Sequence, residues 1–223
     1  MKAMILSAGF GTRLVPYTDS LPKALICHKN LPMINYQIEM LKKYGVREII
    51  VNAHHHYQKI VDYFAKNNFG IDVNVIVENE ILGTGGGILN ASNYLENEKF
   101  FISVNVDIET NMNLPAMIQY HKLFQPLATL AVQKRPTKRY LEFDGEMNLV
   151  GRETDKSDKK NLYAFNGIHI ISNEIFKKDL KVKYEDILNI YFDLIRNGNS
   201  FLRGFDARDS SFKDLGKLEN LII

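Results

Sequence analysis

The first 125 residues alternate regularly between short apolar runs and segments whose apolar residues recur at helical spacing. The runs that predict strands lie at 2–7, 47–53, 71–78 and 99–106. The segments that predict helices lie at 32–45, 58–67, 86–96 and 114–124. Strands joined through helices pair in parallel, and the helices then cover both faces of the sheet. The alternation therefore predicts an α/β protein with three layers and a mostly parallel sheet.

The pattern changes after residue 125. Residues 127–133 and 139–151 look like antiparallel strands, with Asp144-Gly145 as a hairpin turn. Residues 163–171 predict another strand, which short helices follow as far as Asn197. No repeat, low-complexity segment or clear linker interrupts the chain. We expect a single domain over residues 1–223, with a first half at 1–125 and a mixed, hairpin-rich half at 126–223.

Composition excludes several classes of protein. The net charge is +2 with both signs interspersed, which argues against a nucleic-acid binder that relies on bulk electrostatics. No apolar run approaches the roughly 20 residues of a membrane helix, and the N-terminal apolar run is too short for a signal peptide. The single cysteine, Cys27, fits a reducing compartment. We expect a cytoplasmic protein with neither nucleic acid nor membrane as a partner.

The stretch "LSAGFGTRL" at 6–14 follows the first strand and holds two glycines. Such a turn can point several backbone N–H groups at one anion, because glycine has no Cβ to obstruct the approach. By themselves, Gly9 and Gly11 fit a plain strand-exit turn equally well. Leu14 occupies the place of the third glycine of a dinucleotide fingerprint, and no P-loop pattern is present. Arg13 and Lys23 favour the anion site, since together they suit a triphosphate.

The longer stretch "LSAGFGTRLVPYTDSLPKAL" resembles the signature of the sugar-1-phosphate nucleotidyltransferases. "ENEILGTGGGIL" is similar to the family's base-reading loop, "VNVD" to its metal aspartate, and "YAFNGIHII" to its sugar-pocket strand. "DLGKLENL" is similar to the second metal aspartate and closing helix. The resemblance covers essentially the whole chain. It is greatest to the short N-acetylmuramate-1-phosphate uridylyltransferase and mannose- or heptose-1-phosphate guanylyltransferase group.

The resemblance implies a Rossmann-like, three-layer fold of the nucleotide-diphospho-sugar transferase type, with a mostly parallel mixed sheet. It makes 1–125 the nucleotide-binding half and 126–223 the sugar-binding half. The implied substrates are an NTP and a sugar 1-phosphate, and the implied cofactor is Mg²⁺. The residues that it assigns are Arg13 and Lys23 to catalysis; Leu6, Ala8, Gly9, Gly11, Glu78, Gly83 and Thr84 to the nucleotide; Glu153 and Asn166 to the sugar; and Asp107 and Asp214 to the metal.

Taken singly, Asp107 and Asp214 are also typical of helix caps and turns. Asp107 follows a predicted parallel strand, at the edge where open α/β sheets bind ligands. Magnesium suits one or two carboxylates together with substrate phosphates. Glu78 stands where many relatives have glutamine, and a carboxylate only accepts hydrogen bonds. If Glu78 faces the base, it favours GTP or UTP as the nucleotide. The alternative is that Glu78 is a surface glutamate.

The sugar pocket departs from the family pattern. Thr154 replaces the lysine that often follows Glu153, and Phe165 replaces an asparagine, so that Asn166 is displaced by one position. On a strand, one position means the opposite face. Positive charge for this pocket could come from the loop lysines 156, 159 and 160. The basic stretch at 134–139 predicts a solvated hairpin edge, with sugar-phosphate binding as the alternative.

The sequence therefore predicts transfer of a nucleoside monophosphate from an NTP to a sugar 1-phosphate, with release of pyrophosphate. Two alternatives stay open. One is a choline-phosphate cytidylyltransferase of the same fold, and the other is a non-catalytic nucleotide-sugar sensor. The sensor stays open because Val106 stands where relatives often have glycine, and because of the departures at Thr154 and Phe165. The chain is expected to be a monomer or a homodimer.

Overall fold

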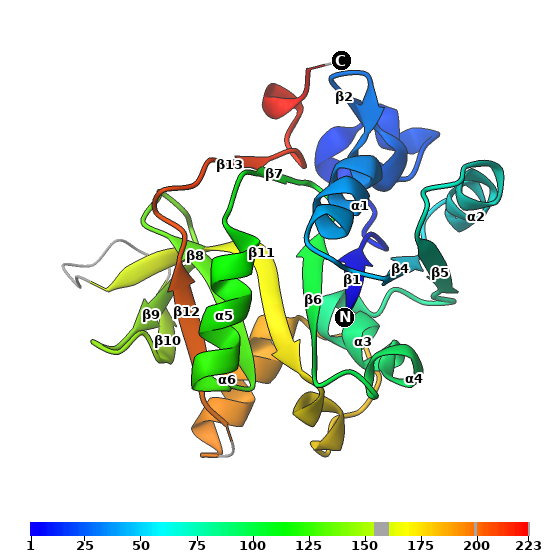
Figure 1. Cartoon of the computed structure of the whole chain (residues 1–223). Coiled ribbons are helices and arrows are strands. Elements are labelled where there is room, and N and C mark those ends of the chain that lie inside the picture. The colour runs from blue at the N-terminus through cyan, green and yellow to red at the C-terminus, as the bar shows by residue number, and fades with distance from the viewer. Residues whose placement is uncertain (154–160, 199, 223) are drawn as a thin grey trace.

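A nine-stranded mixed sheet runs through both halves of the chain (Figure 1). In this computed structural model, residues 1–153, 161–198 and 200–222 are described. The main path of the sheet follows the order β10-β9-β11-β6-β1-β4-β5, and β8 extends from β11 to β12. The strands are β1 (Lys2–Leu6), β4 (Glu48–Ala53), β5 (Asp72–Val77), β6 (Phe100–Asn105), β8 (Ala128–Gln133), β9 (Tyr140–Phe143), β10 (Leu149–Glu153), β11 (Leu162–Ser172) and β12 (Leu202–Asp206).

Parallel pairing dominates the first half, as the alternation predicts. β1 pairs in parallel with β4 and β6, and β4 pairs in parallel with β5. The second half joins this core through β11, which runs antiparallel to β6, β8 and β9. β12 pairs in parallel with β8. The mixed sheet thus has a parallel centre and an antiparallel extension.

Helices cover both faces of this sheet, so the predicted three-layer α/β/α fold is confirmed. Alternate residues of β1 explain the layering, because Ala3 and Ile5 pack into one hydrophobic cluster and Met4 and Leu6 into the other. The first cluster also takes residues of α1 (Met33–Lys43), α2 (Tyr57–Lys66) and α5 (Leu114–Phe124). The second takes residues of α3 (Gly83–Asn90), α4 (Ser92–Leu95) and α6 (Ile187–Arg196). None of the described helices is long and apolar enough to cross a membrane.

The predicted hairpin is present as β9 and β10, which pair antiparallel. Its turn is longer than a two-residue Asp-Gly connection. Asp144 Oδ1 accepts hydrogen bonds from the backbone N–H groups of Glu146 and Asn148, and Met147 takes the left-handed conformation with φ +64°. An Asp side chain that bonds the following backbone nucleates such a loop.

The N-terminus lies at the amino end of β1, whereas the C-terminus lies on the opposite side of the sheet, beside the carboxyl ends of the parallel strands (Figure 1). Here the loop after β1 carries short 3₁₀ helices, and the C-terminal segment returns next to it. Lys29 N donates to Ile222 O over 2.6 Å, and Ile222 N donates to His28 Nδ1 over 3.1 Å. The small elements are η1 (Thr12–Leu14), η2 (Tyr17–Asp19), η3 (Lys23–Leu25), β2 (Cys27–His28), β3 (Leu31–Pro32), β7 (Ile108–Thr110), η4 (Asn173–Lys177), β13 (Phe212–Asp214) and η5 (Leu218–Asn220).

Candidate active site

The glycine loop follows β1 and turns sharply at Gly11. Leu6 and Ala8 are buried, whereas Gly9 is exposed, and no described atom lies within 4 Å of the place where its Cβ would be. Gly11 has φ +66°, and a Cβ there would lie 2.8 Å from Thr18 Cγ2. Both facts require glycine at position 11. At position 9, glycine leaves the backbone open to an approaching ligand.

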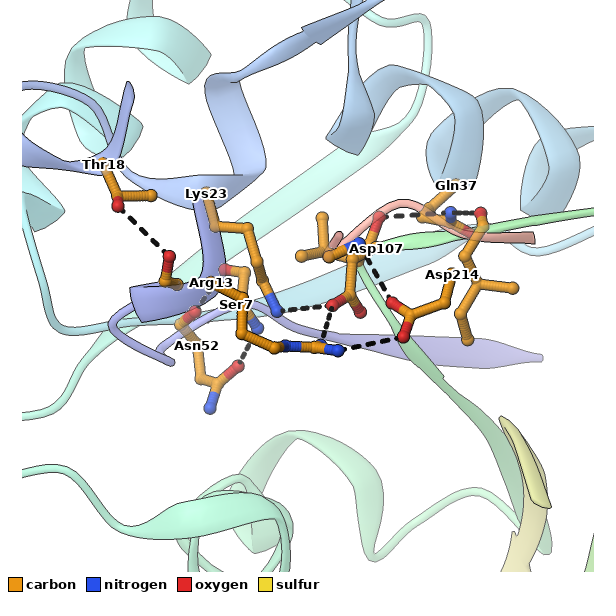
Figure 2. Close-up of polar contacts among 12 residues, drawn as sticks. Ser7, Arg13, Thr18, Lys23, Gln37, Asn52, Asp107 and Asp214 are labelled. Carbon is orange, nitrogen blue, oxygen red and sulfur yellow. Dashed lines mark hydrogen bonds and ion pairs between the residues drawn. The ribbon is translucent and has the colours of Figure 1, made fainter. Parts of the chain in front are cut away.

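Arg13 reaches the carboxylates of both Asp107 and Asp214, and Lys23 reaches that of Asp107 (Figure 2). Arg13 lies on η1; its Nη1 donates to Asp214 Oδ2 over 3.0 Å, and its Nη2 lies 3.8 Å from Asp107 Oδ2. Lys23 begins η3, and its Nζ donates to Asp107 Oδ2 over 3.1 Å. The structure thus brings both predicted cations and both predicted aspartates together beside the glycine loop.

Asp107 lies between β6 and β7, and its backbone is held from two sides. Gln37 of α1 donates from Nε2 to the carbonyl oxygens of Val106 and Ile108, over 3.3 and 2.5 Å. Leu215 N donates to Asp107 O over 2.8 Å. Burial acts to raise the pKa of the Asp107 carboxyl, but the charge and hydrogen bond of Lys23, a backbone hydrogen bond and the charge of Arg13 together outweigh it. The net pKa is lower than usual, so Asp107 is ionised at neutral pH.

Asp214 reaches Asp107 because β13 pairs antiparallel with β7, which places Asp214 opposite Ile108. Gly216 N donates to Asp214 Oδ1 over 3.0 Å. A Cβ on Gly216 would overlap Asp107 Oδ2 and lie 2.9 Å from Asp214 Oδ1. The two carboxylates therefore face one small space, and a side chain at position 216 would displace them.

This donor set suits Mg²⁺. Magnesium is bound through one or two carboxylates and keeps its other positions for water and substrate phosphates. Asp107 and Asp214 supply two hard oxygen donors to one space. No group of three or more His, Cys, Asp or Glu side chains that could hold a metal occurs among the described residues. The residues thus fit an ion that takes ligands from the substrate.

Glu78 is connected to the glycine loop through Asn52. Asn52 Oδ1 accepts from Ser7 N over 2.8 Å, and Asn52 Nδ2 donates to Glu78 Oε1 over 2.7 Å. The other carboxylate oxygen, Oε2, accepts from Leu82 N over 3.0 Å. Glu78 is 3% exposed, so the alternative of a surface glutamate is wrong. Each of its oxygens still has a second lone pair that can accept a hydrogen bond.

Gly83 and Thr84 begin α3 and pack against the chain just before α6. Gly83 has φ +68°, and a Cβ there would lie 2.6 Å from Glu185 O. Thr84 Oγ1 accepts from Ile187 N over 2.9 Å. The predicted base loop is thereby joined to the second half of the chain. Base contacts by these two residues remain a prediction.

The predicted sugar residues lie on β10 and β11 of the second half, which β9 separates. Glu153 ends β10 opposite Tyr140. Asn166 is buried in β11, where Oδ1 accepts from Arg135 Nε over 3.2 Å. The register of β11 shifts between Phe165 and His169, so the rule of simple alternation does not apply at Asn166.

Part of the predicted sugar pocket lies outside the described residues, namely Thr154 and lysines 156, 159 and 160. The basic stretch at 134–139 is only partly the solvated edge that we expected. Lys134, Lys138 and Arg139 are exposed, but Arg135 is half-buried. For Arg135 the prediction of a solvated edge is therefore wrong.

A family model described as "Nucleotidyl transferase" matches residues 2–223. The chain belongs to this nucleotidyl transferase family. It is 31% identical over 178 residues to the D-glycero-alpha-D-manno-heptose 1-phosphate guanylyltransferase of Campylobacter jejuni, which covers 79% of this chain and 78% of that protein. It is 32% identical over 189 residues to mannose-1-phosphate guanylyltransferase 1 of Arabidopsis thaliana, covering 80% of this chain and 52% of that protein.

The chain spans about half the length, or less, of the plant relatives that it matches, from 38% to 52%. Among solved structures, HddC from Yersinia pseudotuberculosis, complexed with GMP-PN, has a TM-score of 0.80 at 24% identity and covers 98% of this chain and 95% of that one. UDP-glucose pyrophosphorylase complexed with UDP-glucose has a TM-score of 0.78 at 17% identity, with 98% and 94% covered. These structures show the shared fold.

Three residues that position the candidate site were not predicted from the sequence. Gln37 holds the backbone on both sides of Asp107, Asn52 joins Ser7 to Glu78, and Gly216 leaves room for the two carboxylates. Asn52 had a signal, since a polar residue near the end of a buried parallel strand faces the ligand edge of the sheet. The sequence contains no signal that distinguishes Gln37, on an amphipathic helix, or Gly216, in a turn, from ordinary residues.

Proposed function

We propose that this chain transfers a nucleoside monophosphate from an NTP, with GTP or UTP favoured, to a sugar 1-phosphate and releases pyrophosphate. One observation supports the proposal above all. Next to an open glycine loop, Arg13 forms ion pairs with Asp107 and Asp214, and Lys23 forms one with Asp107. Two cations, two ligands for Mg²⁺ and exposed backbone amides make up what a metal-bound triphosphate requires.

In this proposal Arg13 binds the β- and γ-phosphates and stabilises the departing pyrophosphate. Its side chain is 58% exposed and can turn toward a substrate, and its planar group can hold two phosphate oxygens at once. Lys23 neutralises charge around the α-phosphate. It is 15% exposed and fixed by Asp107, so it acts as a point charge in a set position.

A Mg²⁺ held by Asp107 and Asp214 would neutralise phosphate charge and bring donor and acceptor phosphates together. The acceptor needs no general base, since a phosphate monoester has its second pKa near about 6 and is largely dianionic at neutral pH. What remains for the protein is alignment and charge stabilisation, which dominate phosphoryl-transfer catalysis.

Glu78 supports the choice of a base that presents N–H donors. Its carboxylate is fixed by Asn52 and Leu82 and keeps free lone pairs, which can accept from guanine N1–H and N2–H or uracil N3–H. The relatives from Campylobacter and Arabidopsis are named as guanylyltransferases, which favours GTP. The heptose and mannose in their names make hexose and heptose 1-phosphates the first acceptors to test.

The test is a pyrophosphate-release matrix of four NTPs against a panel of sugar 1-phosphates and choline phosphate, with Mg²⁺. We expect release with GTP or UTP and one sugar 1-phosphate. Release only with CTP and choline phosphate would indicate the cytidylyltransferase instead. Mg²⁺-dependent nucleotide binding without release from any pair would indicate a sensor. An oligomeric state of one or two chains, and a location in the cytoplasm, remain predictions.

A further inference from the structure

Arg135 occupies an unusual position for a residue of a basic turn. It lies two residues after the end of β8, and it is half-buried although the lysines and the arginine around it are exposed. Its guanidinium carbon lies 4.1 Å from the centre of the Phe212 ring. Stacking on an aromatic ring fixes the plane of a guanidinium. The Arg135 side chain is thus held in a fixed position, unlike a mobile surface cation.

Among the described residues, Arg135 makes its hydrogen bonds and its ring contact with neutral groups only. Its Nε donates to Asn166 Oδ1 over 3.2 Å, and its Nη2 donates to Phe165 O over 2.8 Å. Of the described carboxylates, none lies within ion-pair distance of it. Removing a cation from water is costly unless an anion compensates it. The guanidinium therefore offers its charge, and its remaining N–H groups, to an anion from outside.

The position of Phe212 shows which way this charge faces. Phe212 and Asp214 stand two residues apart on β13, so their side chains lie on the same face of that strand. Burial lowers the pKa of Arg135, and the charge of Asp214 acts to raise it. The guanidinium thus lies near the predicted metal ligand, on the side of the second half of the chain, whereas Arg13 and Lys23 reach the aspartates from the glycine loop.

We propose that Arg135 binds the phosphate of the acceptor, a sugar 1-phosphate. This inference depends on the proposed function, in which the acceptor phosphate must lie beside Asp214 to attack the NTP. The glycine loop, Arg13 and Lys23 serve the triphosphate, so the cation fixed on the opposite half serves the second anion. Asn166, which accepts from the same guanidinium, places a polar side chain where the sugar attached to that phosphate begins.

Steady-state kinetics of pyrophosphate release test the assignment, with KM measured separately for the NTP and for the sugar 1-phosphate. Arg135→Ala should raise KM for the sugar 1-phosphate about 10- to 100-fold, the range of charge-assisted hydrogen bonds. KM for the NTP should change less than about three-fold. Arg135→Lys keeps the charge and should recover part of the loss, whereas Arg135→Gln should not. Arg139→Ala is the matched control, since Arg139 is an exposed cation of the same turn.

A structural role alone would not distinguish lysine from glutamine, so rescue by Arg135→Lys separates charge from packing even if the alanine variant folds poorly. An active wild type whose Arg135→Ala variant keeps its KM for the acceptor overturns this inference and leaves the proposed function intact. Equal increases in both KM values, or the same effect from Arg139→Ala, also overturn it. A wild type inactive with every pair overturns the proposed function and, with it, this assignment.

Discussion

Gly216 offers the sharpest test of the two-aspartate site, because a single methyl group placed there meets three charged groups at once. The Cβ of Gly216→Ala would overlap Asp107 Oδ2 and lie 2.6 Å from Arg13 Nη2 and 2.9 Å from Asp214 Oδ1. Ordinary contacts begin at 3.4 Å. The charged groups must therefore move by about 0.5 to 1 Å, and a misplacement of that size can cost about 100-fold in rate.

The same substitution should cost little stability. Overpacking costs about 1–3 kcal/mol, and the low end applies here because the Cβ meets only the ends of side chains, of which Arg13 is 58% exposed. A loss of 1 kcal/mol lowers Tm by about 2–4 °C in a chain of this size. We therefore expect kcat/KM to fall about 100-fold while Tm falls by only a few degrees.

Pyrophosphate release and thermal denaturation measure the two effects. A higher Mg²⁺ concentration for half-maximal rate should accompany the loss, because the displaced groups are the predicted metal ligands. Gly145→Ala is the matched control, since Gly145 is exposed and no described atom lies within 4 Å of its Cβ position. A folded Gly216→Ala variant whose kcat/KM stays within three-fold, or about 0.7 kcal/mol, of wild type would refute the reasoning.

Three further changes test other parts of the account. Arg13→Ala should lower kcat/KM by about 10³-fold or more in the pyrophosphate assay, as for a transition-state arginine, with Tm nearly unchanged because the side chain is largely exposed. Lys23→Met leaves the 10% exposed Asp107 carboxylate without its nearest cation, so urea denaturation should show a loss of about 3 kcal/mol; an unchanged midpoint would contradict the pairing. Burial lowers the pKa of His121 to about 4 and that of His169 to about 3. Only the unfolded chain takes up these protons as the pH falls below about 6.5. The free energy of unfolding is therefore highest above pH 6.5, and below that pH each histidine lowers it by about 1.4 kcal/mol per pH unit, down to its own folded pKa. Urea midpoints from pH 7 to 5 measure this, and His169→Gln should flatten the slope if the variant folds.

The strand and helix pattern of the first half was predictable because each apolar run is short, continuous and ended by polar or glycine residues. Parallel connection then fixes which strand ends share an edge. The loop with Arg13 and Lys23 lies at that edge, and so does the loop with Asp107. Asp214 joined them only through the family resemblance, because nothing local shows that β13 pairs with β7.

Other parts of the site depend on contacts that no local pattern reveals. Arg135 looked like one of several solvated cations, and its burial depends on Phe212, which is far away in sequence. Gly216 looks like an ordinary turn glycine until Asp107 is placed next to it. For Asn166 the alternation rule failed physically, because Gly167 adopts φ +72° within the irregular part of β11.

The charges of the site explain why its two cations should have different roles. Asp107 is 10% exposed and would be costly to bury alone, but Lys23 lies 3.1 Å away in a shielded position. Arg13 is tied to the same carboxylates from the solvent side, at 3.0 and 3.8 Å. If Mg²⁺ binds the carboxylates and a triphosphate binds Arg13, each charged group exchanges one partner of opposite charge for another. No charge is then left without a partner. This exchange requires a side chain that can move. Arg13 is 58% exposed and can move, whereas Lys23 is 15% exposed and fixed by Asp107. In the proposed reaction Lys23 would therefore keep holding Asp107, and Arg13 would be the group that passes from the aspartates to the substrate.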